Sequence, residues 1–433
     1  MSPRPTLLIV SYHCAPSPAV GGKRFSFLAR EFTALGYDVH IVANELEESK
    51  LGAPDSSLPR AGTVHRVAAP FRLPLTGQSW FIRKLNQVFY RLLAPVSLEY
   101  FWAGAATRRA IEVARGLPRG IVIATSPPHA AAIAGARISR QLGWPLILDY
   151  RDPWTANDWP AWRRSAIELA IARPIERRLV RASAARVLNT PAMRVFFERD
   201  FPQAPLERNY VVPNGFDPVE TRAAPASDGT IDIVHAGEIY TGRSLVPVMK
   251  AAQRLMARHP GRSIRVTNYG DLPAIEWQRI RAAGLGQYVQ VLPRIPFTEL
   301  FAKLQAAHVL LALVGDHMLY STPYKVYDYM AAGRPVLGLA PRGAALFEML
   351  AESRAGTCIE PDDDAGIEQA LEQLLFSPSA DTPRTQRYRW SNLALMYKAV
   401  IETVAADSGH HEPDAAVATP RQPLGAQSRS AAN

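Results

Sequence analysis

Short apolar runs alternate with longer amphipathic segments along most of the chain. In the first half, runs that predict strands lie at 6–12, 38–43, 120–124, 145–150 and 187–189. Between the first two runs, residues 23–35 have the apolar spacing of a helix, and Gly36 is expected to end it. This alternation is typical of a parallel sheet covered by helices on both faces, whose ligands bind at the carboxyl ends of the strands.

The second half repeats the alternation after a break in composition. Runs that predict further strands lie at 231–236, 263–267, 289–292 and 308–313. Before the break, residues 211–217 read as a strand followed by an Asn-Gly turn, and residues 221–230 are rich in Ala, Pro and Ser. We therefore expect two α/β domains, at 1–217 and 231–385, joined by a linker at 218–230.

Composition limits the compartment and the partners. The chain has 433 residues, a formal net charge of +10 and only two cysteines, Cys14 and Cys358, one in each half. No disulfide framework is possible, no run of ~18 apolar residues predicts a transmembrane helix, and the first apolar run is too short for a secretory signal. We therefore expect a cytoplasmic protein. The positive charge favours an anionic partner, but no zinc-finger spacing or RNA-binding strand motif points to nucleic acid.

One stretch of the first domain, 71–110, departs from the simple alternation. Within it, apolar residues recur at helical spacing with basic residues between them: Phe81, Ile82, Leu85, Val88, Phe89 and Leu92. A basic amphipathic helix of this kind suits the surface of an anionic membrane, here the inner face of the cell membrane. Alternatively, its apolar face packs on the domain's own sheet. Both interpretations stay open.

The stretch 319–338, LYSTPYKVYDYMAAGRPVLG, predicts a loop, a short helix and a buried strand. Ser321 and Thr322 are candidate N-caps before Pro323, and Gly333 can end the helix in a left-handed conformation. The start of such a helix favours anions, because its N–H groups are free and its dipole is positive there.

Two charged residues on that helix predict its ligand. Lys325 and Asp328 are three residues apart and therefore share one face. A cation that can meet a phosphate thus lies beside a carboxylate that can accept two hydroxyls, as on a ribose. This outline indicates a sugar-nucleotide site. The alternative is a surface helix that merely precedes a core strand.

The phrase P-Y-K-V-Y-D-Y-M-A-A-G-R-P-V at 323–336 resembles the donor-binding signature of family 4 retaining glycosyltransferases. The resemblance implies the GT-B fold, in which two facing Rossmann-like domains enclose a cleft. It also implies a last helix, at 386–406, that crosses back to the first domain. Asp328 stands at the family's second glutamate, and Tyr320 replaces the first, which usually reaches the transferred sugar. A tyrosine lacks that negative charge.

Other positions extend the resemblance. The phrase P-N-G-F-D at 213–217 is similar to the family's domain junction. Gly21 and Gly22 stand where the family has a pair of glycines near the donor sugar and diphosphate, although a double glycine is also a common turn. Arg243 falls at the family's diphosphate-binding lysine, whereas Glu238 stands where an arginine is usual. Lys325 can supply the lost charge.

The phrase D-Y-R-D-P-W at 149–154 resembles the D-x-R-D-x-W of a subset of family 4 enzymes. It follows a predicted strand, as does His129, so both are expected at the cleft. The resemblance makes Arg151, Asp152 and His129 candidate catalytic residues. A structural role stays open for each, because Asp–Arg pairs often only tie loops together.

The resemblance thus implies retaining transfer from a nucleotide-diphosphate sugar to a glycan or lipid-linked acceptor in polysaccharide or glycoconjugate assembly. Neither a metal nor a cofactor is expected to take part. The alternatives are a nucleotide-sugar epimerase or hydrolase of the same fold, and a non-catalytic nucleotide-sugar-binding protein. Beyond residue 406, the tail 407–433 is expected to be disordered, because it has few aliphatic residues.

Overall fold

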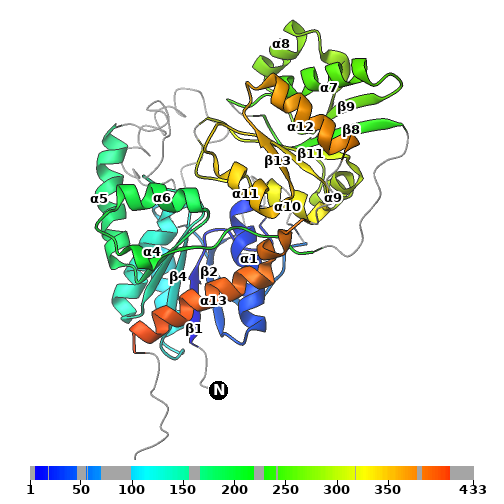
Figure 1. Ribbon diagram of the computed structural model, residues 1–433. Coiled ribbons are helices and arrows are strands. Elements are labelled where there is room, and N and C mark those ends of the chain that lie inside the picture. Colours follow the sequence, from blue (N-terminus) through cyan, green and yellow to red (C-terminus); the bar gives the residue numbers. More distant parts are fainter. Residues whose placement is uncertain are drawn as a thin grey trace, which may run out of the picture.

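The computed structural model describes residues 5–17, 19–45, 55, 57–69, 99–155, 166–218, 229–239, 242–316, 318–377 and 383–409. Two α/β domains stand one above the other, and each is built on its own parallel sheet (Figure 1). The chain has the predicted GT-B architecture: two Rossmann-like sheets flanked by helices.

The N-terminal sheet has seven strands in the order β3-β2-β1-β4-β5-β6-β7. Their bounds are β1 Thr6–Val10, β2 Val39–Asn44, β3 Thr63–Val67, β4 Gly120–Ser126, β5 Leu146–Tyr150, β6 Ala185–Leu188 and β7 Asn209–Val211. The helices are α1 Val20–Ala34, α3 Trp102–Ala114, α4 His129–Leu142, α5 Ala166–Ala182 and α6 Pro191–Asp200. Successive residues of β1 serve opposite cores: Leu8 packs with α3 and α4, and Leu7 packs with α1.

The C-terminal sheet has six strands in the order β10-β9-β8-β11-β12-β13. Their bounds are β8 Thr230–Ala236, β9 Ser263–Tyr269, β10 Val289–Leu292, β11 Val309–Leu313, β12 Val336–Leu339 and β13 Gly356–Ile359. The helices are α7 Val246–Arg258, α8 Ala274–Ala282, α9 Phe297–Ala306, α10 Lys325–Ala332, α11 Ala345–Ser353 and α12 Asp364–Phe376. All described strand pairs in both sheets are parallel, so the carboxyl ends of each sheet's strands lie along one edge.

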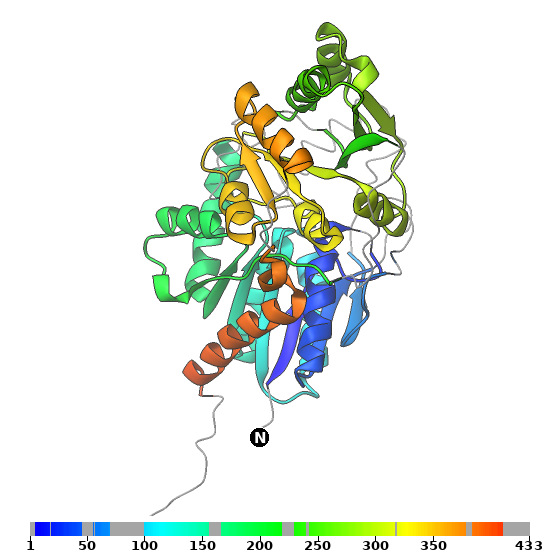
Figure 2. The ribbon, with the colours of Figure 1, turned by 45° about the vertical axis from the view of Figure 1, so that its right-hand side comes forward.

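The last helix, α13 (Trp390–Asp407), leaves the C-terminal domain and packs beside α1 on the N-terminal sheet (Figures 1 and 2). Its buried face, which includes Trp390 and Tyr397, belongs to the same apolar core as β1. Phe27 of α1 stacks on Trp390 with ring centroids 5.5 Å apart. This helix therefore ties the two domains together.

Two local predictions were wrong. Helix α1 begins at Val20, so Gly21 and Gly22 lie inside its first turn and not in the loop before it. Helix α10 begins at Lys325 after Tyr324, and no side chain caps it; Ser321 and Thr322 precede it as buried loop residues. The predicted end of α10 is confirmed, because Gly333 has φ 70° and closes the helix in the left-handed region.

Some predictions fall on parts of the chain that the structure does not describe. The basic aromatic stretch 81–92, most of the linker at 219–228 and the tail beyond residue 409 lie outside the described residues. Within the described part of the chain, no helix is both long and apolar enough to cross a membrane.

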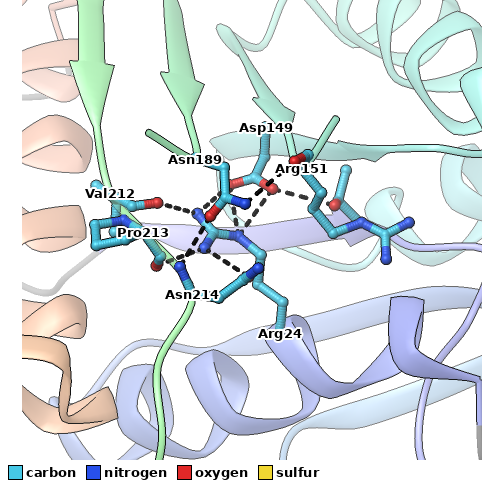
Figure 3. Close-up of polar contacts among 8 residues, drawn as sticks. Arg24, Asp149, Arg151, Asn189, Val212, Pro213 and Asn214 are labelled. Carbon is cyan, nitrogen blue, oxygen red and sulfur yellow. Dashed lines mark hydrogen bonds and ion pairs between the residues drawn. The ribbon is translucent and has the colours of Figure 1, made fainter. Parts of the chain in front are cut away.

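One buried ion pair joins three parts of the N-terminal domain (Figure 3). Arg24 of α1 donates to both carboxylate oxygens of Asp149 on β5, at 2.8 to 3.1 Å. The same guanidinium donates to the carbonyl oxygens of Val212 and Pro213, at 2.9 and 2.8 Å. Arg24 is 1% exposed and Asp149 is not exposed at all. The arrangement anchors the residues that lead to the second domain.

We predict that Asp149→Asn lowers the free energy of unfolding by about 3–5 kcal/mol, because it leaves the buried Arg24 charge without its counter-ion. Arg30→Gln is the matched control. Arg30 lies on the same helix and pairs with the half-exposed Asp217, so its loss should cost under about 1 kcal/mol. Chemical denaturation followed by tryptophan fluorescence measures both. Equal losses for the two variants would contradict the assigned role of the buried pair.

Candidate functional site

The starts of two helices, one from each domain, face each other. Lys23 in the first turn of α1 places its Nζ 3.7 Å from Oδ2 of Asp328 on α10. The same ammonium lies over the rings of Phe297 and Tyr324, 4.3 and 4.8 Å from their centroids. The contact joins the N-terminal domain to the helix that the sequence singled out.

Beside this contact, a cavity of about 210 Å³ opens at the carboxyl edge of the C-terminal sheet. Its lining residues come from the ends of β8, β9 and β10 and from helices α9 and α10: Ala236, Gly237, Tyr269, Arg294, Ile295, Leu300, Leu304, Lys325, Asp328 and Tyr329. Lys325 and Asp328, which share a helix face as predicted, therefore line one cavity. The carboxyl edge is where parallel α/β sheets bind ligands.

Lys325 is held against the end of β8. Its Nζ lies 2.9 Å from Nε2 of His235. Gly237 has φ +120°, and a Cβ there would lie 3.0 Å from Nζ, so a side chain would both strain the backbone and crowd the ammonium. Burial, together with the nearby Arg243 charge, lowers the pKa of Lys325 to about 7. The lysine is thus charged only up to about neutral pH unless an anion binds.

Asp328 is the acidic group of the cavity. Burial raises the pKa of its carboxyl to about 6, although the Lys23 ammonium opposes the shift. Helix α10 is positioned through Tyr329, whose hydroxyl accepts from the Ala236 N–H at 3.1 Å and donates to the Leu311 carbonyl at 3.3 Å. These two bonds fix the height of Lys325 and Asp328 above the sheet.

Two further cations lie near this cavity. Arg294 lines it and forms an ion pair with Glu238, so the acidic residue at the family's usual arginine position is neutralised. Arg243 lies behind it, is 9% exposed, and places Nη2 3.4 Å from Sδ of Met318. It lines a separate cavity of about 150 Å³, and its charge lowers the pKa of both Lys325 and His235.

On the N-terminal side, Arg151 lies against the first turn of α1. A Cβ built at Gly21 would lie 2.5 Å from Nη1 of Arg151, so glycine is what allows the guanidinium to come this close. The Nε of Arg151 is buried and has no hydrogen-bond partner among the residues that the structure describes. His13 adjoins the same group, and burial together with the Arg151 charge lowers its pKa to about 4, so its imidazole is neutral.

Asp152 follows Arg151 in the loop after β5, and His129 begins helix α4 after the neighbouring strand β4. Burial raises the pKa of Asp152, and Arg151 opposes the shift. His129 is the first residue of α4; its Nδ1 lies 2.6 Å from Oγ of Ser126, and its ring stacks on Trp154 with centroids 4.4 Å apart. The phrase 149–154 and His129 are therefore brought together at the carboxyl ends of β4 and β5, as the sequence predicts.

The structure does not bring Tyr320, Ser321 and Thr322 to the cavity of Lys325. The Tyr320 ring packs in the N-terminal core at 6.0 Å from the Phe196 centroid, and its carbonyl accepts from the Thr190 hydroxyl. Ser321 is buried beside it. Thr322 lines another cavity, of about 130 Å³, between the domains. The family's first glutamate thus has no side-chain counterpart at Tyr320.

Sequence reasoning missed three side chains of this region: Lys23, His235 and Arg294. A lone basic residue in a helix or a single histidine in an apolar run carries no motif. The signal for His235 was its place near the end of a predicted strand, two residues before Gly237.

Two family models cover most of the chain. Residues 21–215 match the glycosyl transferase 4-like domain, and residues 230–377 match the glycosyl transferases group 1 domain. The chain is a glycosyltransferase. The cavity that holds Lys325 and Asp328 belongs to its group 1 domain. No curated protein sequence matches this glycosyltransferase.

Solved structures of similar fold cover nearly the whole glycosyltransferase. Sucrose-phosphate synthase from Thermosynechococcus elongatus has a TM-score of 0.56 at 16% identity, over 94% of this chain and 98% of its own. The α,α-trehalose 6-phosphate synthase of Burkholderia multivorans has a TM-score of 0.56 at 16% identity, over 93% and 100%. HepE of Anabaena, in complex with UDP and glucose, has a TM-score of 0.52 at 14% identity, over 94% and 98%. At these identities the likeness concerns the fold.

Proposed function

We propose that the chain transfers a sugar from a nucleotide-diphosphate sugar, with retention of configuration, to a glycan or lipid-linked acceptor in polysaccharide or glycoconjugate assembly. The observation that carries the proposal is the cavity shared by Lys325 and Asp328 at the carboxyl edge of the C-terminal sheet. An ammonium and a carboxylate on one helix face match the phosphate and the ribose of one nucleotide. The complex of HepE with UDP and glucose supports a donor of this class.

In this proposal the donor diphosphate lies against Lys325, with the Arg243 charge behind it. Transfer breaks the bond between the sugar and the diphosphate, so negative charge develops on the leaving phosphate. Fixed cations in a site shielded from water stabilise that charge more strongly than water does. Asp328 accepts the ribose hydroxyls and holds the nucleotide in register. The apolar part of the lining, such as Leu300 and Ile295, would face the base.

The acceptor and the transferred sugar are assigned to the N-terminal side. Arg151 lies against Gly21, and its Nε has no partner within the described part of the chain. Asp152 follows it in the loop after β5, and His129 begins the neighbouring helix α4. We propose that these groups contact the transferred sugar and the acceptor hydroxyl. The Tyr320 ring packs in the N-terminal core. In this proposal, polar groups of the N-terminal domain therefore make the contacts with the sugar that the first glutamate makes in other members of the family.

A donor screen tests the proposed function. Thermal shift with UDP-, GDP-, ADP- and dTDP-sugars identifies the donor, and a nucleotide-release assay then measures turnover. We expect one class of donor to raise the melting temperature and to release its nucleoside diphosphate. Binding without release would favour a non-catalytic sensor, and no binding to any of these donors would refute the proposal.

We predict that Lys325→Ala weakens binding of the donor's nucleoside diphosphate by about 1.5–3 kcal/mol, the value of a charge-assisted hydrogen bond. Arg243→Ala should cost less, because removing this charge also lets the pKa of Lys325 rise. Lys250→Ala is the control, since that ammonium pairs with Asp364 on the surface. Calorimetric titration measures all three. Wild-type affinity in the Lys325 variant would place the site elsewhere.

We also predict that nucleoside diphosphate binding is strongest between about pH 6 and 7. Below about 6, Asp328 is protonated and loses its charge as an acceptor for the ribose; above about 7, Lys325 loses its proton and its attraction for phosphate. Asp328→Asn should remove the acidic limb of the profile, and Lys325→Ala the alkaline limb. The titration of the ligand's own phosphates affects wild type and both variants equally, so it cancels when their pH profiles are compared. Unchanged limbs in both variants would contradict the assignment.

A further inference from the structure

A chain of hydrogen bonds runs behind Lys325 into the C-terminal sheet. Asn268 on β9 donates from Nδ2 to the carbonyl oxygen of Gly270 at 2.7 Å. Its Oδ1 lies 2.6 Å from Nδ1 of His235 on β8, and Nε2 of His235 lies 2.9 Å from Nζ of Lys325. His235 and Asn268 are both fully buried. Neither belongs to the donor cavity itself.

The bond between Asn268 and Gly270 determines which group donates and which accepts in the other two hydrogen bonds. A peptide carbonyl only accepts, so Asn268 must turn its NH₂ toward Gly270 and its oxygen toward His235. Nδ1 of His235 therefore carries the ring proton, and Nε2 presents its lone pair to Lys325. The lysine ammonium is the donor in the last bond.

The neutral imidazole of His235 affects Lys325 differently from the way a carboxylate partner would. A carboxylate at the position of His235 would cancel the charge of Lys325, whereas a neutral imidazole holds the ammonium and leaves its charge available. Among the described residues, no ion pair joins Lys325 to an acidic group, because the nearby Asp328 pairs with Lys23 instead. The groups whose charges act on His235 are Lys325 and Arg243, and both lower its pKa together with burial.

We propose that His235, held in one tautomer by Asn268, is a positioning residue that aims the charged ammonium of Lys325 at the diphosphate of the donor. This inference rests on the proposed function for the ligand, but the contact between His235 and Lys325 exists without it. The buried pair His235 and Asn268 acts only through Lys325 and does not touch the nucleotide.

Two amide variants separate the two ends of the imidazole. His235→Asn keeps a polar group at the place of Nδ1, within reach of Asn268, but cannot reach Lys325. His235→Gln places an amide oxygen near the position of Nε2 and keeps an acceptor for Lys325. A merely structural role would make the two variants alike. His259→Asn is the control, since that imidazole directly follows α7 and faces Glu372 of α12.

The first measurement needs no nucleotide. Competitive acetylation of the ligand-free, full-length protein across pH, read by peptide mass spectrometry, gives the pKa of Lys325. His235→Asn should lower that pKa by about one pH unit, because an acceptor for the charged form is lost. His235→Gln and His259→Asn should leave it near the wild-type value. An unchanged pKa in His235→Asn overturns the proposal.

The second measurement compares the nucleoside diphosphate found in the donor screen with its parent nucleoside by calorimetry. At pH 8, His235→Asn should bind the diphosphate about tenfold more weakly than wild type and bind the nucleoside equally well. At pH 6 the difference should shrink to about twofold, because Lys325 is then mostly charged in wild type and about half charged in the variant. Equal weakening for the diphosphate and the nucleoside would overturn the positioning role. If wild type binds no nucleoside diphosphate, the proposed function fails, and the acetylation result alone decides the role of His235.

Discussion

The buried ion pair between Arg24 and Asp149 locates the N-terminal half of the site. Arg24 lies one turn beyond Gly21 on α1, and Asp149 lies two residues before Arg151. Because the same guanidinium also holds the carbonyl oxygens of Val212 and Pro213, it sets where the chain leaves this domain. A buried pair of this kind carries a large desolvation cost, which its four additional hydrogen bonds offset only if the geometry is kept. The positions of the first turns of α1 and of the domain junction at 213–217 therefore both depend on this one ion pair.

Contacts between the domains then hold helix α10 of the C-terminal domain against the N-terminal domain. The Tyr324 hydroxyl donates to the Gly215 carbonyl at 3.2 Å, just before α10, and Lys23 reaches Asp328 at the other side of the same helix start. Helix α13 adds a large apolar contact with α1. Helix α10, which carries the proposed donor-binding residues, is thus held by both domains. A donor that takes the Asp328 carboxylate must compete with Lys23 for it.

Patterns along the chain predicted the fold because parallel strands that are buried on both faces read as continuous apolar runs. Strand β10 was predicted with its observed bounds, and β12 as the buried strand after α10. Strand β3 was missed because it lies at the sheet edge, and its sequence TVHRV is polar and partly exposed. Helix starts were less predictable: Val20 and Lys325 begin helices without a capping side chain, so no residue marks the boundary.

The site was predictable where it depends on local spacing and not where it depends on contacts between distant segments. Lys325 and Asp328 share a cavity because residues three apart share a helix face. The burial of Tyr320 against Phe196 follows from how the two domains meet, which no local pattern records. The pairing of His235 with Asn268 likewise joins two strands 33 residues apart in the sequence.

The most direct test asks whether the Asp328 carboxylate accepts hydrogen bonds from the ribose hydroxyls of the donor. Calorimetry would compare the donor's nucleoside diphosphate with its 2′,3′-dideoxy form, on wild type and on Asp328→Asn. The account predicts that the variant loses about 1.5–3 kcal/mol for the ribose form and much less for the dideoxy form, because the latter offers no hydroxyls to the carboxylate. Equal losses for the two ligands would show that the carboxylate does not touch the ribose, and would contradict the assignment of this cavity to the donor nucleotide.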